Sequence, residues 1–505
     1  MNAMRVLITL LLLVVLIDSC NNSTQREKKG PTAMADEQDS IITSNSSDQS
    51  DLFFNSLRKA HKLYVGDFDT MQKRRIIRVL VPYSRTLFFN DKGRERGITA
   101  DNFREFEMYL NKKYFKKPHS IPFTVVFVPT SRDKLLKNLI LGVGDIAAGN
   151  LTATEARLRH VDFVAPKEQG SVSELVLNRN QDPPILSLVQ LSGKTIHVRK
   201  SSSYYESLQK LNFEFTAKGK MPINLKIVSE DLEDEDLMEM LDAGIIKLII
   251  IDDWMARMWS QILPNIRINK QAAVRQGSYI GCAFRKNSPL LTDELKEFYY
   301  DYEQPLASMP YRLKKYYQNV KHLQDPTNSD NAKRYTQVMN LFEKYGEEYG
   351  FDPLMLAALG FQESQLDQSK RSPVGAIGVM QLMPRTGASM KVGNIRIVES
   401  NIHAGTKYMQ ILMTRYFKDA HFDAFNKSLF AFASYNAGPE RISNLRRLTA
   451  ERGLNPDVWL NNVEIISSEK IGLETNTYVR NIIKYYYSYK LMLERNAERQ
   501  KLVLQ

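Results

Sequence analysis

The chain of 505 residues contains only two cysteines, Cys20 and Cys282. Two cysteines cannot form a disulfide framework, and a zinc site would need its ligands from elsewhere. Long hydrophobic runs are also scarce, and the run near the N-terminus, residues 6–17, is too short to span a bilayer comfortably. Glycine (24 residues) and proline (19 residues) are not enriched, which excludes collagen-like and low-complexity classes.

The short hydrophobic run has the features of a targeting signal. It follows a single early cation, Arg5, and Cys20 comes shortly after its end, preceded by the small residue Ser19. This arrangement resembles a bacterial lipobox, in which the cysteine is lipidated and becomes the first residue of the mature protein. The sequence therefore predicts a lipoprotein signal peptide over 1–19, and a lipidated Cys20 with a flexible tether over 20–70. A plain secretory peptide cleaved nearby is the alternative.

The residue after the cysteine and the charge of the chain indicate where the protein works. Asn21 is not the aspartate that retains enterobacterial lipoproteins in the inner membrane, so we expect an outer-membrane lipoprotein that faces the periplasm. The formal net charge is +12, which favours an anionic partner such as a lipid surface, a nucleic acid or an acidic cell-wall polymer. Because the chain is secreted and has no nucleic-acid-binding motif, we do not expect it to bind nucleic acid.

Two kinds of pattern divide the rest of the chain. In the first region, short apolar runs typical of strands alternate with segments whose apolar residues have helical spacing. The runs are 76–81, 123–128 and 248–251, and the helical segments are 101–114 and 132–141. Such alternation is typical of α/β units with a mostly parallel sheet. Residues 306–334 are polar, rich in tyrosine and interrupted by proline, which suits a connector. Helical signals then dominate residues 335–505.

Two features of the first region could be mistaken for reactive sites. The acidic stretch 230–242 is interpreted as the solvated face and the negatively charged first turn of a helix, and not as a metal site. Cys282 lies in the apolar, strand-like run 279–284, which predicts a buried and unreactive thiol.

Several motifs follow one another in the first region: GDIAAG at 144–149, LTATEAR at 151–157, VDF at 161–163, LSGKTI at 191–196 and IIDD at 250–253. Together they resemble the family 3 periplasmic solute-binding proteins, and imply a two-lobed α/β regulatory domain over 71–305 with a ligand cleft between the lobes. In amino-acid binders of that family, the arginine at the Arg157 position holds the ligand carboxylate with its forked guanidinium. The resemblance thus implies that Arg157 and Thr152 bind a muropeptide or an amino acid. The alternative is that Arg157 is a surface residue at a helix end.

In the second region, Asp352 and Pro353 mark the start of a helix, because aspartate accepts unpaired backbone N–H groups and proline fits the first helical position. Glu363 shares a face of this helix with Leu356, Leu359 and Gly360. Apolar neighbours raise the pKa of a carboxyl, as a general acid near neutral pH requires. From helix geometry alone, a surface glutamate remains the simpler interpretation.

Motifs around Glu363 change that interpretation. After Glu363 and Ser364 come four segments in order: SPVGAIGVMQLMPRT at 372–386, NIHAGTKY at 401–408, SYNAGP at 434–439 and ETNTYV at 474–479. The set resembles the family 1 lytic transglycosylases, and implies a mainly α, lysozyme-like catalytic domain over 335–505. It also implies Glu363 as the catalytic residue, and a set of substrate-binding residues: Ser364, Ser372, Gly378, Met380, Gln381, Tyr435, Asn436 and Tyr478.

The number of carboxylates distinguishes the possible reactions. Ordinary glycosidases use two, whereas the motifs contain one catalytic glutamate, Glu363. In the resembled family, that glutamate cleaves the bond between MurNAc and GlcNAc in peptidoglycan without water and leaves a 1,6-anhydro sugar. No metal or cofactor is expected. Two alternatives stay open: a goose-type-like muramidase, which is a hydrolase, and a non-catalytic lipoprotein that binds or senses the cell wall.

Overall fold

The computed structural model describes residues 63–115, 121–166, 171–302 and 323–503, which all fall within one compact unit of the chain. The predicted signal peptide, Cys20 and most of the predicted tether lie outside the described residues, and so does 303–322 of the predicted connector. Within the described ranges, no helix is long and apolar enough to cross a membrane.

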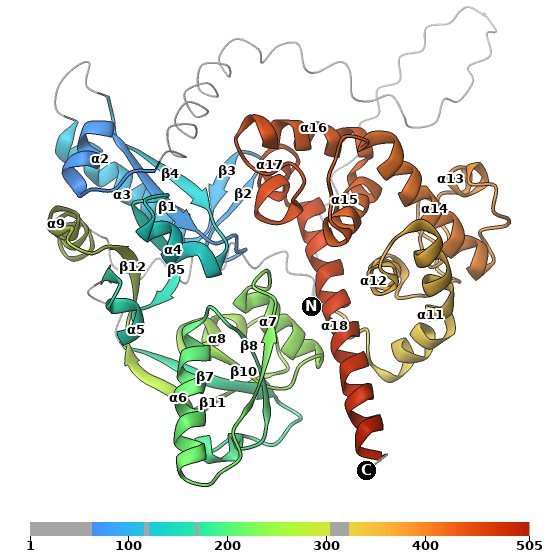
Figure 1. The fold of residues 1–505 in the computed structure, drawn as a ribbon, viewed down its shortest axis with the longest axis horizontal. Coiled ribbons are helices and arrows are strands. Elements are labelled where there is room, and N and C mark those ends of the chain that lie inside the picture. The colour runs from blue at the N-terminus through green and yellow to red at the C-terminus, as the bar shows by residue number, and fades with distance from the viewer. Residues whose placement is uncertain (1–62, 116–120, 167–170, 303–322, 504–505) are drawn as a thin grey trace, which may run out of the picture. The chain divides into compact units, whose positions relative to one another are not determined.

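The first lobe of the α/β region contains one five-stranded sheet, shown in blue and teal with its last strand in yellow-green (Figure 1). Its strands are β1 (Ile76–Val81), β4 (Thr124–Pro129), β5 (Ile146–Thr152), β6 (Val161–Val164) and β12 (Ile280–Arg285). The order is β4-β1-β5-β12-β6, with β1 parallel to β4 and β5 and with β12 antiparallel to β5 and β6. Cys282 lies buried in β12, as predicted.

Helices cover both faces of this sheet. The surrounding elements are α2 (Phe68–Arg74), β2 (Phe89–Asp91), β3 (Arg94–Arg96), α3 (Ile98–Tyr114), α4 (Leu135–Ile140), α5 (Glu155–Leu158), α9 (Pro289–Glu297) and a π-helical turn (Phe298–Tyr302). Phe103 and Phe106 of α3 pack with Val79 of β1 on one face. Leu135 and Leu139 pack with Leu80 on the other, because successive strand residues point to opposite sides.

The second lobe is built on a separate sheet (green in Figure 1). Its elements are β7 (Val172–Arg179), β8 (Thr195–Arg199), α6 (Ser203–Ala217), β9 (Asn224–Val228), α7 (Asp234–Ala243), β10 (Ile249–Asp252), α8 (Asp253–Trp259) and β11 (Ile266–Ser278). β7 lies between β10 and β11 and is antiparallel to both, whereas β8 and β9 form a parallel pair. The expectation of a mostly parallel sheet therefore holds only for part of this region, since the strands that cross between the lobes run antiparallel.

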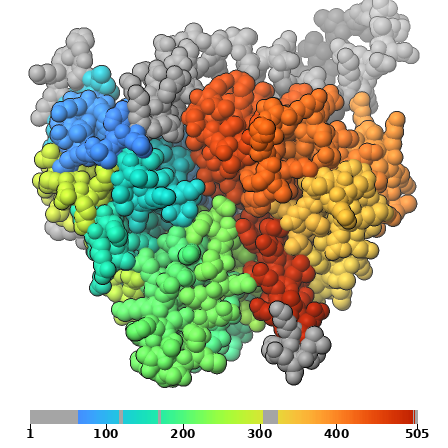
Figure 2. Space-filling view, in the orientation of Figure 1, coloured from blue at the N-terminus to red at the C-terminus, as the bar shows by residue number. Residues whose placement is uncertain are grey.

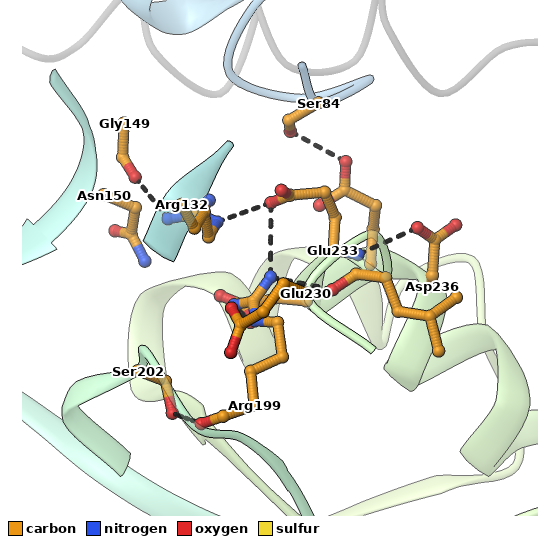
Figure 3. A network of polar contacts seen from close by, with 12 residues as sticks. Ser84, Arg132, Gly149, Asn150, Arg199, Ser202, Glu230, Glu233 and Asp236 are labelled. Atoms are coloured by element: carbon orange, nitrogen blue, oxygen red, sulfur yellow. Dashed lines mark hydrogen bonds and ion pairs between the residues drawn. The ribbon is translucent and has the colours of Figure 1, made fainter. Parts of the chain in front are cut away.

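The acidic stretch of the second lobe differs from its interpretation. A helix does begin there, with α7, but its acidic side chains are buried and not solvated: Glu233, Asp234, Glu235, Asp236, Glu239 and Asp242. Cations from other parts of the chain compensate them. Arg132 bonds Glu233 through Nε at 2.7 Å, and Arg199 lies 3.4 Å from the same carboxylate (Figure 3). Buried carboxylates are retained when they are paired, and the sequence pattern does not show these distant partners.

The last region is helical (yellow to red in Figures 1 and 2). Its helices are α11 (Ser329–Tyr349), α12 (Pro353–Ser364), α13 (Pro384–Ser389), α14 (Val398–Tyr416), α15 (Ala424–Ala437), α16 (Pro439–Glu451), α17 (Glu464–Ile471) and α18 (Leu473–Val503), with a π-helical turn over Trp459–Val463. α11 begins at Ser329, inside the range predicted as connector. α12 is buried along most of its length and packs against both α11 and α18.

Candidate active site

Glu363 lies in the last turn of α12, where its side chain is partly buried. The helix begins as predicted, with the Asp352 carboxylate accepting a 2.8 Å hydrogen bond from the N–H of Leu354. Burial raises the pKa of Glu363 to about 7, while a short hydrogen bond from the Tyr478 hydroxyl acts in the opposite direction. The carboxyl is therefore poised to give and to take a proton near neutral pH.

The chain turns sharply directly after the glutamate. Gln365 and Leu366 both adopt left-handed backbone conformations, with φ of +59° and +60°. Neither residue is glycine, so each conformation costs roughly 1–3 kcal/mol that the surrounding packing must offset. Leu366 is buried, and its packing helps to hold the turn that ends α12 beneath Glu363.

A tight loop over residues 370–382 follows this turn, and isolated β-bridges join Ile377 to Arg371 and to Leu382. Asn401 of α14 fastens the loop, because its side chain accepts from the N–H of Met380 at 2.8 Å and donates to the carbonyl of Ile377 at 2.9 Å. Gly378 has φ of +77°, and a Cβ there would lie 2.7 Å from the Asn401 amide nitrogen. Glycine is thus required by packing inside the loop.

Two tyrosines join this loop and Glu363 to the other motifs. Tyr435 of α15 donates a 2.7 Å hydrogen bond to the carbonyl of Met380, and Tyr478 of α18 donates to the Glu363 carboxylate. Burial and the nearby Glu363 carboxyl raise the pKa of both phenols well above 10, so that they remain hydrogen-bond donors. The structure therefore brings four separated motifs together at one carboxyl.

Sequence reasoning missed Thr475, whose hydroxyl donates a 2.9 Å hydrogen bond to the side-chain oxygen of Asn436. Asn436 is exposed, and this bond fixes its side-chain oxygen. Thr475 lies inside the ETNTYV motif, so the motif itself was the signal that could have identified it.

Three of the residues predicted to bind substrate are buried. The Ser364 hydroxyl donates to the carbonyls of Gly360 and Val379, and Met380 is fully buried, with its side chain against Gly405 of α14. Gly378 is buried as well. The side chains of Ser364 and Met380 make hydrogen bonds or packing contacts inside the domain, and they thereby support the loop next to Glu363.

The remaining predicted residues of the loop are partly exposed. The Ser372 hydroxyl accepts from the N–H of Ala376 at 2.9 Å, and Gln381 donates through Nε2 to the carbonyl of Gly378 at 2.8 Å. Both side chains thus stabilise the loop while keeping one edge towards solvent. Tyr435, Asn436 and Tyr478 remain the predicted residues whose placement suits contact with a ligand at Glu363.

One carboxyl dominates this site. Burial raises the pKa of Glu363 and the hydrogen bond from Tyr478 lowers it. Among the residues that the structure describes, no second carboxylate contributes to this shift. Asp367, four residues after Glu363, accepts a hydrogen bond from the Ser369 hydroxyl at 2.6 Å. Over the same described ranges, no group of three or more His, Cys, Asp or Glu side chains could hold a metal ion.

Arg157 lies at the junction of the two lobes of the α/β region, in the short helix α5, which Thr154 caps. Its guanidinium donates to the Glu206 carboxylate of α6 at 3.0 Å and to the backbone carbonyls of Thr152 and Ser201. The side chain of Thr152 is buried and accepts from the Ser203 hydroxyl at 3.2 Å. Arg157 is thus no isolated surface arginine, and a carboxylate of this chain already contacts it.

Two further carboxyls face the same junction. Glu174 and Asp252 are buried; Oδ1 of Asp252 has no hydrogen-bond partner, whereas Oε1 of Glu174 is ion-paired with Nε of Arg275 at 3.5 Å. Burial, with Glu174 and Asp234 nearby, raises the pKa of Asp252 to about 8, and Glu174 also acts on the charge of Arg157. The junction therefore combines the guanidinium of Arg157 with a carboxyl, Asp252, that has one oxygen free to accept a hydrogen bond.

Comparison with known families confirms the predicted domain order. Residues 77–305 match the bacterial extracellular solute-binding proteins, family 3, and residues 340–457 match the transglycosylase SLT domain. Similar proteins include a membrane-bound lytic murein transglycosylase F from Desulfosudis oleivorans, 28% identical over 70% of this chain and 79% of the relative. Another from Pseudomonas fluorescens is 27% identical over 81% of this chain and 84% of the relative.

Solved structures similar to the α/β region include the arginine-bound form of truncated ArgBP from T. maritima. It is 19% identical, covers 45% of this chain and 97% of its own, and has a TM-score of 0.37. An ancestral arginine-binding protein bound to arginine is 22% identical over 48% of this chain and 99% of its own, also with a TM-score of 0.37. The two-lobed fold follows from the sheets described above and from the family match.

Proposed function

We propose that this chain, like the membrane-bound lytic murein transglycosylases F that it resembles, is a peptidoglycan lytic transglycosylase. The SLT domain and the named relatives agree with an enzyme of this class. The observation that carries the proposal is Glu363, a single carboxyl whose pKa is raised to about 7 and which four ordered motifs surround. The bond cleaved is the β-1,4 link between MurNAc and GlcNAc.

In the first step, protonated Glu363 gives its proton to the glycosidic oxygen, and the bond from that oxygen to C1 of MurNAc breaks. The 2-acetamido group of the substrate supports the cationic C1 in place of a protein nucleophile. The resulting Glu363 carboxylate retains the hydrogen bond from Tyr478. Since that hydrogen bond stabilises the charged form, Tyr478 eases the loss of the proton.

In the second step, the C6 hydroxyl oxygen of MurNAc attacks C1 of the same sugar, and the Glu363 carboxylate takes the proton of that hydroxyl. A 1,6-anhydro ring forms, the acetamido group is released and Glu363 is protonated again. One group with a pKa near 7 serves as acid and then as base. Water does not enter the products, in agreement with a site that has one carboxyl and not the two of ordinary glycosidases.

Mass spectrometry of the muropeptides released from purified peptidoglycan tests the proposal. We expect 1,6-anhydro ends, and we expect Glu363→Gln to lower their rate of formation by several orders of magnitude, because a positioned acid and base are each worth about 10²–10⁴-fold. Glu451→Gln, at the exposed end of α16, is the matched control. Reducing ends would indicate a goose-type-like muramidase, and absence of release would indicate a wall-binding lipoprotein.

The α/β region is proposed to sense a cell-wall peptide or amino acid. The residues at the junction of the lobes support a zwitterionic ligand: Arg157 suits its carboxylate, while the Asp252 oxygen that has no hydrogen-bond partner suits its ammonium group. A ligand carboxylate that binds Arg157 takes the place of Glu206. The ligand therefore changes a contact between α5 of one lobe and α6 of the other, which is a route from occupancy to lobe movement.

The long helix α18 supports a coupling of this region to catalysis. Tyr478 near its start contacts Glu363, and Lys484 bonds Glu239 of α7 at 2.7 Å (α18 red and α7 green in Figure 2). Arg480 donates to the backbone carbonyl of Asp231 at 3.3 Å. One helix thus contacts both the catalytic carboxyl and the second lobe. A movement of the lobe that shifts α18 would therefore alter the contact between Tyr478 and Glu363.

Calorimetry with muropeptides and with free amino acids tests the sensing role. We expect Arg157→Ala to abolish binding and the response of activity to the ligand, which a coupling of 1–3 kcal/mol would make about 5- to 150-fold. The exposed neighbour Arg159 supplies the control variant Arg159→Ala. Equal binding by both variants would exclude Arg157 as the carboxylate site, and no binding by the unmodified chain would exclude the sensing role.

Anchorage in the outer membrane through a lipidated Cys20, facing the periplasm, completes the proposal. The lipobox-like sequence supports it, and the named relatives are membrane-bound. We expect Cys20→Ala to yield soluble periplasmic protein or uncleaved precursor, because the acyl chains are the anchor. Variant protein that stays with the membrane after high-salt washing would contradict this.

A further inference from the structure

A pocket of about 620 Å³ opens in the helical domain, between the junction of α15 and α16 and the end of α17. One part of its lining is aliphatic, with Leu445, Leu448 and Ile471. The polar part consists of Arg441, Asn444 and Lys470, with the carboxylate of Glu440 beside them. A pocket of this size holds a small peptide segment, and none of these side chains takes part in the chemistry proposed for Glu363.

The cations of the pocket are available to a ligand. Arg441 is exposed and has no ion-pair partner among the residues that the structure describes. Lys470 is exposed and lies 3.2 Å from Glu469, but that carboxylate is already bound by both terminal nitrogens of Arg452. The pocket thus offers two cations against the single free carboxylate of Glu440, next to an aliphatic surface.

The pocket is joined to the active site by the chain itself. Its residues Ala437 and Gly438 directly follow Asn436, and Ile471 comes four residues before Thr475. Thr475 and Asn436 are bonded to each other, and each lies within three residues of a tyrosine, Tyr478 or Tyr435, whose pKa the Glu363 carboxyl raises. Both walls of the pocket therefore continue into the segments that carry Tyr435 and Tyr478, the two tyrosines at the Glu363 carboxyl.

We propose that this pocket binds the acidic peptide attached to the glycan strand, and so acts as a peptide subsite of the catalytic domain. Peptide carboxylates bind Arg441 and Lys470, and short apolar side chains cover Leu445 and Leu448. An uncharged sugar would gain little from these two cations, whereas charge-assisted hydrogen bonds are about twice as strong as neutral ones. The inference rests on the proposed function and adds a preference for glycan that carries peptides.

The test compares two substrates, glycan strands with their peptides attached and the same strands after enzymatic removal of the peptides. For each, kcat/KM is measured from the anhydro product with the full chain and with Arg441→Gln, Lys470→Gln and the double variant. We expect each substitution to lower kcat/KM about tenfold on peptide-bearing strands, and the loss to be at least fivefold smaller on stripped strands. Arg447→Gln, an exposed cation on the same helix paired with Glu451, is the control.

The outcomes separate this inference from the proposed function. Equal losses on both substrates, or no loss on either, overturn the peptide subsite while leaving the transglycosylase activity in place. If the unmodified chain makes no anhydro product, the proposed function fails. Calorimetric binding of peptide-bearing strands to Glu363→Gln then still tests the pocket, since Arg441→Gln in that chain should weaken binding about tenfold. Repeating the series in an Arg157→Ala chain removes any contribution of the sensing cleft.

Discussion

At the scale of single residues, the charge state of Glu363 determines when the site works. Its pKa, raised by burial to about 7, keeps part of the carboxyl protonated at neutral pH. Because the first step needs the protonated form, kcat/KM should fall as pH rises through that pKa. A glutamate with an ordinary pKa near 4.3 would instead be almost fully ionised under the same conditions.

The hydrogen bond from Tyr478 lowers the pKa of Glu363, so its removal should raise it. We predict that Tyr478→Phe moves the alkaline limb of the kcat/KM profile to higher pH and lowers its maximum about tenfold. The exposed Tyr300→Phe is a control that should leave the limb unchanged. A limb that stays in place or moves to lower pH would show that Tyr478 does not stabilise the charged carboxyl.

The same carboxyl makes stability depend on pH. The folded-state pKa of Glu363 lies above the unfolded value, so the folded state binds more protons between them, and the free energy of unfolding decreases as pH rises through about 7. Glutamine cannot titrate. We predict that Glu363→Gln is more stable than the unmodified chain at pH 8, and that this gain shrinks towards pH 4, as measured by urea unfolding. A gain independent of pH would contradict the prediction.

Residues also differ in how far the sequence predicts their roles. Glu363 is predictable because helical spacing places it among apolar side chains and the motifs surround it. Ser364 and Met380 stand in the same motifs, and their side chains are buried in packing contacts that the motifs alone do not predict. Thr475 shows the converse, because its role depends on a hydrogen bond to Asn436 of another helix.

At the scale of elements, the sequence predicts a helix or strand correctly where its formation depends on residues that are close in the chain. β1 and the start of α12 agree with the predictions because apolar runs and helix caps are local signals. The acidic start of α7 does not, because its burial depends on cations supplied by other elements. The bridged loop 370–382 is likewise held by Asn401, which lies about twenty residues further along the chain.

Asn401 gives a prediction for this loop. The variant Asn401→Ala should lower the free energy of unfolding by about 1–3 kcal/mol for each buried backbone group left without a partner. It should also reduce turnover, because Tyr435 contacts the loop at Met380. Urea unfolding with an unchanged m-value and an activity assay provide the measurements. Asn394→Ala, which alters an exposed turn, should change neither quantity appreciably.

At the scale of the whole described molecule, buried ion pairs link regions that are distant in sequence. Lys484 of α18 contacts both Asp236 and Glu239 of α7, and all three side chains are buried. Removal of one partner from a buried ion pair leaves an uncompensated charge and costs about 3–5 kcal/mol. We therefore expect α18 to couple the unfolding of the α/β region to that of the helical domain.

We predict that Lys484→Met lowers the melting temperature and separates the unfolding of the two regions into distinct calorimetric transitions. Lys490→Met on the same helix, which removes an exposed cation, is the control. A single transition at an unchanged temperature would show that the ion pairs of Lys484 do not couple the regions. A lowered single transition would show that they stabilise both regions together.

The two left-handed residues after Glu363 set a limit on how far this enzyme can be made heat-resistant. Glycine adopts such a conformation without a steric penalty, so Gln365→Gly would remove strain and raise the melting temperature. It would also loosen the turn that ends α12 after Glu363, and we expect this to slow turnover. A substitution at this position would therefore raise thermal stability at the expense of turnover. Engineering for heat resistance is better directed at exposed loops far from α12.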